Sequence, residues 1–166
     1  TPISITVGVG RGAREGVLFK DAESLETLRG VDILVVDKTG TLTQGRPKLT
    51  RLITCGSLAE DHALRFAAPI ERYSEHPLAR AVVAEAEVQG LALEETQNFE
   101  AEVGGGVSAE VDHHRVAVGK RSFLDDHGVQ GLAALDREAE ALQADGQTVI
   151  YLAIDDKLAA ILAVSD

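Results

Sequence analysis

Runs of apolar residues predict several strands along the chain. VDILVV, residues 31–36, has the length and composition of a buried strand. PKLTRLITC, residues 47–55, reads as another. Near the end of the chain, TVIYLAI and KLAAILAV stand on either side of Asp155 and Asp156, which predicts a hairpin with a tight turn.

Apolar residues at the spacing of one helix face predict four helices. We expect them at residues 21–29, 57–68, 77–90 and 132–144. Pro69 lies just beyond the expected end of the second helix. Pro77 suits the first turn of the third, and Gly90 closes it.

Short strands of alternating pattern fill residues 98–118. NFEAEV, VSAEV and HRVAV are joined by Gly104-Gly105-Gly106 and by Asp112-His113, which predicts antiparallel pairing. The first 20 residues are rich in glycine and give no clear pattern. The fold class expected is therefore α/β (α+β), with an antiparallel sheet flanked by helices.

The composition limits the function classes. A formal net charge of −11 repels phosphate backbones and anionic lipid, so nucleic acid is not an expected partner, and a bound phosphate needs local donors. The single cysteine, Cys55, cannot form an internal disulfide and is read as a small buried residue. No apolar run approaches the roughly 20 residues of a spanning helix. We therefore expect the chain as given to be soluble, and we expect it to be a monomer. Because the chain has no initiator methionine and no signal-peptide pattern, we read its N-terminus as a cut end.

Asp37 ends the apolar run at 31–36 and is followed by Lys-Thr-Gly-Thr. Active-site groups of α/β sheets gather beyond the carboxyl ends of strands. A carboxylate nucleophile there would be fixed and exposed, and the next residues offer amides and hydroxyls to surround a phosphoryl group. An aspartate after an apolar strand is usually a turn residue, but the contiguous DKTGTLT is far more specific.

DKTGTLT resembles the phosphorylation motif of P-type ATPases, whose aspartate accepts the terminal phosphate of ATP. The flanking sequence is similar to the heavy-metal branch, in particular the copper(I) exporters. Residues 1–20 resemble the cytoplasmic exit of the membrane helix that follows the Cys-Pro-Cys motif of that branch, a motif absent here. IERYSEHPLARAVV resembles its Ser-Glu-His-Pro signature, and GGGV its Gly-x-Gly loop. The resemblance covers essentially the whole chain.

The resemblance implies the chemistry of the first site. Asp37 would be the phosphorylated nucleophile, with Lys38, Thr39 and Thr41 as the other catalytic residues of the loop. Mg²⁺ would be bound by Asp37 and by the backbone carbonyl of Thr39. Related phosphatases carry a general acid and base at the position of Thr39, and threonine cannot do that work. The phosphoenzyme is therefore expected to persist, which argues against a phosphatase.

Glu71 and His76 stand on either side of the loop between two expected helices, so both can face one pocket. A lone histidine at a helix start is more often structural than a ligand. The resemblance implies instead that both residues contact the adenine of ATP, and that Gly104 and Gly106 let the nucleotide approach the backbone. Lys120 stands where many relatives have asparagine, and we interpret it as a surface lysine rather than a phosphate or ribose ligand.

Two other patterns are set aside. The glycines at 8–12 lack the preceding strand of a dinucleotide fingerprint. His113 and His114 are adjacent at a turn and cannot easily face one metal ion together.

The resemblance also implies a domain organisation. Residues 1–43 would be the membrane linker and the first part of a haloacid-dehalogenase-like phosphorylation domain, 44–155 an inserted nucleotide-binding domain, and 156–166 a return into the truncated first domain. The parent would be a copper(I) exporter at the cytoplasmic face of a membrane, using ATP and Mg²⁺, with membrane, actuator and remaining phosphorylation domains as partners. A zinc or cadmium pump, or a nucleotide-binding module without turnover, is the alternative.

Overall fold

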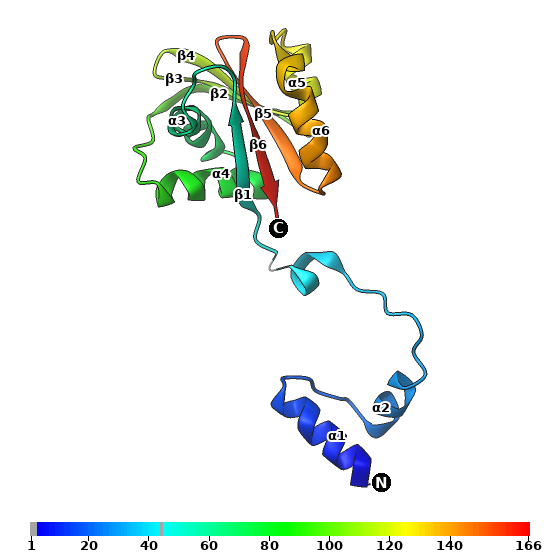
Figure 1. Cartoon of the computed structure of the whole chain (residues 1–166). Helices are drawn as coiled ribbons and strands as arrows, with labels where there is room; N and C mark the ends of the chain where they lie inside the picture. The colour runs from blue at the N-terminus through cyan, green and yellow to red at the C-terminus, as the bar shows by residue number, and fades with distance from the viewer. Residues whose placement is uncertain (1–2, 44) are drawn as a thin grey trace. The chain divides into compact units, whose positions relative to one another are not determined.

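Six antiparallel strands form one sheet, in the order β1-β6-β5-β4-β3-β2 (Figure 1). The strands are β1 (Lys48–Thr54), β2 (Thr96–Glu102), β3 (Gly106–Val111), β4 (His114–Gly119), β5 (Thr148–Ile154) and β6 (Lys157–Ser165). The predicted hairpin is confirmed, with Asp155 and Asp156 both at positive φ in its turn. The three short antiparallel strands predicted within 98–118 are confirmed as well.

The computed structural model describes residues 3–43 and 45–166, except for the side chains of Lys38 and Thr39. The chain divides into two compact units, one up to Leu42 and one from Thr43 onward. The larger unit holds the sheet. Within the described residues, no helix is long and apolar enough to cross a membrane.

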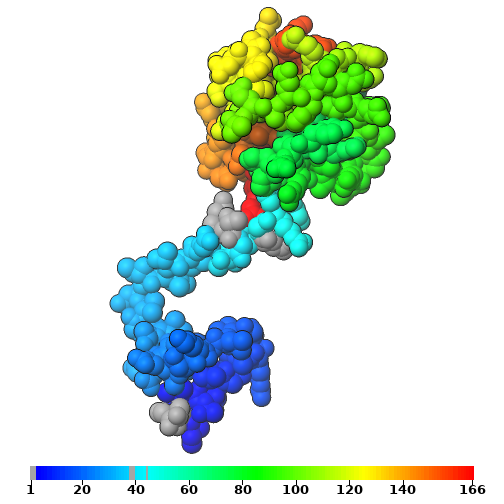
Figure 2. Space-filling model, turned by 180° about the vertical axis from the view of Figure 1, so that it is seen from behind, coloured from blue at the N-terminus to red at the C-terminus, as the bar shows by residue number. Residues whose placement is uncertain are grey.

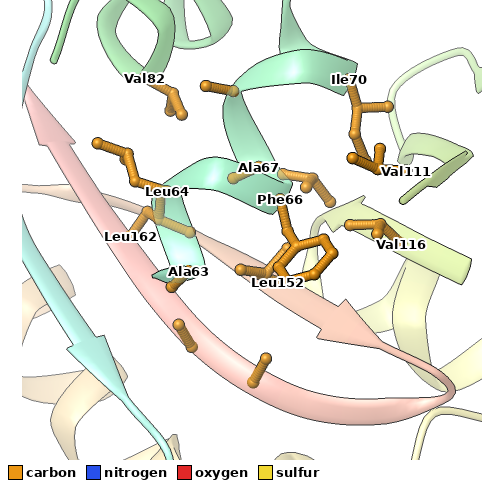
Figure 3. Close-up of a cluster of buried hydrophobic side chains, with 14 of the residues drawn as sticks. Ala63, Leu64, Phe66, Ala67, Ile70, Val82, Val111, Val116, Leu152 and Leu162 are labelled. Carbon is orange, nitrogen blue, oxygen red and sulfur yellow. The ribbon is translucent and has the colours of Figure 1, made fainter. Parts of the chain in front are cut away.

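Helices cover both faces of the sheet (Figure 1). One face carries α3 (Glu60–Glu71) and α4 (Pro77–Val88), and the other carries α5 (Arg121–Asp126), the 3₁₀ turn η2 (Leu132–Leu135) and α6 (Asp136–Ala144). Figure 3 shows Leu64 and Ala67 of α3 above Leu152 of β5 and Leu162 of β6. Because helices cover both faces, nearly every residue of β5 and β6 is buried. This explains why both strands have continuous apolar sequences instead of alternating apolar and polar residues.

The helix predictions need small corrections. The second helix was expected to stop before Pro69, but α3 continues through it to Glu71. Pro69 stands in the last turn, where its missing N–H removes one hydrogen bond, and its ring is buried. The predicted helix at 132–144 begins as a 3₁₀ turn. Helix α5 was not predicted, because six residues are too few to show a helical period.

The smaller unit contains α1 (Ile3–Arg14), α2 (Ala22–Leu28) and a π-helical turn, η1 (Lys38–Leu42). Helix α2 was predicted, and the Asp21 side chain caps it by accepting from the Ser24 N–H at 2.7 Å. Helix α1 was not predicted, because its glycines disfavour a helix. Gly12 is packed so closely that a Cβ there would lie 2.7 Å from the Phe19 ring. Gly12 therefore leaves the space that the Phe19 ring occupies.

The predicted buried strand at 31–36 is wrong. These residues form no strand, and Ile33, Leu34 and Val35 are about four-fifths or more exposed. A strand needs neighbours to hydrogen-bond with and a layer to cover it. None of the described strands pairs with this segment.

From the sequence, domain boundaries are expected after residues 43 and 155. The division of the chain falls after Leu42, and Lys157–Ser165 forms strand β6 between β1 and β5. The last residues are thus part of the sheet. The hydroxyl of Thr43 donates to the Asp166 carboxylate at 2.5 Å, so the two ends of the larger unit meet.

Candidate functional site

A pocket of about 290 Å³ opens in the larger unit, at the end of α3 and the start of α4. It is lined by Glu71 and Ser74 at the end of α3, by His76 and Leu78 at the start of α4, and by backbone and side chains of β2 to β5. Figure 2 shows the side of this unit on which the green segments of α3, α4 and β2 lie. Its size and mixed apolar and polar lining suit a flat aromatic ring.

The pocket brings together the four residues predicted to hold the nucleotide. Glu71, His76, Gly104 and Gly106 all line it. Glu71 ends α3 and His76 precedes α4, whereas Gly104 lies in the turn after β2 and Gly106 begins β3, about 30 residues further along the chain. Apolar side chains of Leu78, Val107, Val118 and Ile150 also line it.

Glu71 is the buried acid of the site. Its side chain belongs to the last residue of α3 and is 7% exposed, and among the described residues it is the only charged residue that is buried. Burial raises the pKa of the Glu71 carboxyl to about 7, and a hydrogen bond from the Ser74 hydroxyl opposes part of this rise. The carboxyl is therefore poised between its neutral and charged forms near neutral pH.

His76 is fixed by two hydrogen bonds. Its Nδ1 accepts from the Leu78 N–H at 3.2 Å, which makes it the N-cap of α4. The backbone N–H of His76 donates to the Ser74 hydroxyl oxygen at 3.3 Å. Because Nδ1 accepts, the neutral ring carries its proton on Nε2. Nε2–H can then donate a hydrogen bond to a ligand, and the face of the ring can stack on one. The structural role and a ligand role are thus compatible.

Ser74 links the two predicted residues and was given no role from sequence. Its hydroxyl bonds to the Glu71 carboxyl and accepts from the His76 backbone. The signal was present in the Ser-Glu-His-Pro stretch, where serine stands three residues after Glu71. Glu75, next to it, is exposed and does not line the pocket.

The glycines between β2 and β3 serve the packing as well as the pocket. Gly104 has a φ of +75° in the turn. A Cβ on Gly106 would lie 2.5 Å from both the Phe123 ring and the Val118 carbonyl oxygen. A Cβ on Gly119 would lie 2.7 Å from the Gly105 carbonyl oxygen. Gly106 and Gly119 therefore let two backbones and the Phe123 ring pack closely beside the pocket.

Lys120 lines the pocket, although sequence favoured an ordinary surface lysine. Its backbone N–H donates to the Gly105 carbonyl oxygen at 3.0 Å, which ties it to the glycine turn. It also lines a second hollow with Arg121 and Thr148, so the two depressions adjoin. Its side chain is exposed, as expected of a cation facing an anionic ligand or solvent.

The predicted phosphorylation loop lies in the smaller unit. Asp37 is exposed and directly precedes η1, in which Gly40 has a φ of +78°. Thr41 is exposed as well, and the side chains of Lys38 and Thr39 lie outside the described part of the chain. The predicted magnesium ligands, the Asp37 carboxylate and the Thr39 carbonyl, are both oxygen donors, which Mg²⁺ prefers.

No protein-only metal cage is present in the part of the chain that the structure describes. His113 is exposed, and His114 Nδ1 lies 2.6 Å from Asp155 Oδ2 instead of facing its neighbour. Cys55 is a free, half-buried thiol, less buried than predicted.

Comparison with known proteins defines the family. A family model of haloacid dehalogenase-like hydrolases matches residues 31–166. The chain belongs to this family. Within the family, it is 49% identical over 166 residues to a copper-exporting P-type ATPase of Legionella pneumophila, and it spans 22% of that relative's length. The resemblance to heavy-metal P-type ATPases is therefore confirmed.

Solved structures of heavy-metal P-type ATPases have the same fold as this chain. A zinc-transporting PIB-type ATPase matches 98% of this chain and 26% of its own, with a TM-score of 0.83 and 34% identity. The N-domain of a copper-transporting P-type ATPase matches over 72% of this chain and 99% of its own, with a TM-score of 0.62 and 28% identity. A catalytic CPx-ATPase domain, studied for its conformational changes upon nucleotide binding, matches with a TM-score of 0.64, 25% identity and coverage of 95% and 53%.

Proposed function

We propose that this chain binds ATP for a heavy-metal pump, and that the pump transfers the terminal phosphate to Asp37. The pocket that gathers Glu71, Ser74 and His76 carries the proposal, because it offers a fixed polar edge and an apolar floor for a purine base. Copper(I) export is favoured by the similarity to a copper exporter. The match to a zinc-transporting ATPase keeps zinc as the second candidate.

In this proposal the larger unit holds the nucleotide and the smaller unit begins the phosphorylation site. The base enters the pocket beside Glu71 and His76. Lys120 supplies positive charge at the mouth of the pocket, where the phosphate chain extends outward. The exposed carboxylate of Glu102 lines the same pocket. A cation at this place therefore offsets the repulsion of an anionic ligand.

At the phosphorylation site, the Asp37 carboxylate would attack the terminal phosphorus of ATP and release ADP, which leaves an acyl phosphate. Mg²⁺, when bound by Asp37 and the Thr39 carbonyl, would neutralise phosphate charge. Because Thr39 is neither acid nor base, hydrolysis of the acyl phosphate would wait for another group, as a transport cycle requires.

The direct test is to titrate the chain with ATP and with GTP and to measure the heat of binding by calorimetry. We expect weak ATP binding, since one open pocket buries limited area, and a preference for ATP over GTP. If millimolar ATP produced neither binding heat nor a spectral change, the proposal would be contradicted. Equal affinity for GTP would mean that the pocket reads phosphate and not the base.

His76 offers a sharper test, because its helix cap can be separated from its ring. His76→Gln removes both, whereas His76→Asn keeps a good N-cap side chain and removes only the ring. If the ring contacts adenine, both variants lose about 1 to 3 kcal/mol of ATP affinity. Only His76→Gln should also lose stability, by about 1 kcal/mol. Normal ATP binding by His76→Asn would make His76 a purely structural residue.

A further inference from the structure

Glu71 is an unusual group to bury. It lies at the end of α3 with a carboxyl that lines the pocket, among Leu78, Val107 and Ile150. Among the described residues, no arginine or lysine charge shifts its pKa. Burial raises the pKa to about 7, and Ser74 is the one hydrogen-bonding partner that lowers it. A neutral carboxylic acid is thus readily available at this position.

Other ionisable groups reach the same pocket from the neighbouring elements. They are His76 at the start of α4, Glu102 on β2 and Lys120 after β4. Both His76 and Lys120 are exposed, and Glu102 is exposed as well. None of the three contributes to the shift at Glu71, so burial alone dominates its ionisation.

The protonation state decides which base a carboxyl can pair with. A carboxylic acid has one donor and one acceptor side by side, whereas a carboxylate only accepts. The Watson–Crick edge of adenine presents the N6 amino donor next to the N1 acceptor, so it pairs fully with the neutral acid. The guanine edge presents two adjacent donors, N1–H and the N2 amino group, so it pairs fully with the carboxylate.

We propose that Glu71 reads adenine as the neutral carboxylic acid, donating its O–H to N1 and accepting from the N6 amino group. This inference rests on the proposed function, in which the pocket holds the base of ATP. Glu71 then determines base specificity through its proton. The preference for adenine over guanine should weaken as the pH rises and Glu71 ionises.

The test uses adenosine and guanosine, because the phosphates of ATP titrate in the same range. Affinities are measured by NMR chemical-shift titration of the whole chain at about pH 5.5 and about pH 8.5. The ratio of adenosine to guanosine affinity should fall at least tenfold across this interval. Titrations of Glu71→Gln and Glu71→Ala, each checked for a folded spectrum, accompany the wild type.

Glu71→Gln is the decisive variant. Its amide keeps one acceptor and one donor at every pH, so it should bind adenosine within a few-fold of the wild type at low pH and lose the pH dependence. Glu71→Ala should bind adenosine at least tenfold more weakly at low pH. Because His76 remains in Glu71→Gln, a pH dependence that persists there would belong to His76 and overturn the inference.

Two further results would contradict the inference while leaving the base pocket intact. One is a wild-type adenosine affinity that stays constant or rises with pH. The other is a Glu71→Gln variant that binds adenosine as weakly as Glu71→Ala. If instead Glu71→Ala binds adenosine as well as the wild type, or the wild type binds none at either pH, the pocket is not the base site and the proposed function falls with the inference.

Discussion

The apolar run Ile33–Val36 and strand β6 have similar compositions and opposite surroundings. In the first, Leu34 and Val35 are 78% and 90% exposed, and in the second, Ile161 and Leu162 are fully buried. Strand β6 has β1 and β5 as hydrogen-bonded neighbours and helices on both faces. In the part of the chain that the structure describes, residues 33–36 pair with no strand and are exposed. An apolar run thus gives a segment the capacity to be a core strand, and its neighbours decide whether it becomes one.

The largest expected effect comes from truncating a leucine to alanine in each of the two runs. Leu162→Ala should lower the free energy of unfolding by about 2 to 5 kcal/mol, because it leaves a cavity between β6 and α3. Leu34→Ala should change it by no more than about 0.5 kcal/mol, since the side chain has little to lose. Urea denaturation followed by circular dichroism measures both. Equal losses would mean that Leu34 is buried in solution.

The comparison extends to charge, where the burial of Glu71 should make stability depend on pH. Its pKa is raised on folding from 4.5 to about 7, so the folded state holds the proton more tightly than the unfolded state. The stabilisation is complete below about pH 4.5 and is lost as the pH rises to about 7. The loss amounts to about 3 kcal/mol.

Glu71→Gln isolates this effect from the other carboxyls. Asp21, Asp136 and Asp155 have lowered pKa values because of hydrogen bonds to partners, and they act in the opposite direction. They are the same in both proteins, so the difference in unfolding free energy between wild type and variant should grow in favour of the variant from pH 4.5 to 7. A difference that is flat across this range would show that Glu71 is solvated in the folded state.

Glycines give a smaller contrast between the two units. Gly106→Ala should cost about 1 to 3 kcal/mol, because its Cβ would overlap the Phe123 ring and the Val118 carbonyl oxygen. Gly10→Ala in α1 meets no atom within 4 Å and should leave the stability unchanged or raise it by about 0.5 kcal/mol. Thermal unfolding of the two variants provides the measurement. A stable Gly106→Ala protein would mean that both the Phe123 ring and the Val118 backbone can move aside.

Sequence patterns predicted best where local chemistry and neighbours agree. The β5–β6 hairpin, the start of α4 at Pro77 and the pairing of Glu71 with His76 in one pocket were all foreseen. Helix α1 was missed because its three glycines, Gly8, Gly10 and Gly12, disfavour a helix by propensity. The role of Ser74 and the place of Lys120 depend on how loops fold against one another, which spacing alone does not reveal.

The smallest effect should come from removing residues 1–42 altogether. The core, both sheet edges and the whole pocket lie in the unit from Thr43 onward, so the shortened chain should fold with a melting temperature within a few degrees of the full one. Its ATP affinity should be unchanged, because every residue that lines the pocket is retained. Solubility should improve, since the exposed run Ile33–Val36 is gone. Calorimetry with ATP and thermal unfolding of both chains test this. A shortened chain that binds ATP clearly more weakly would place part of the nucleotide site in residues 1–42, and the separation of the two units into a binding part and a phosphorylation part would have to be given up.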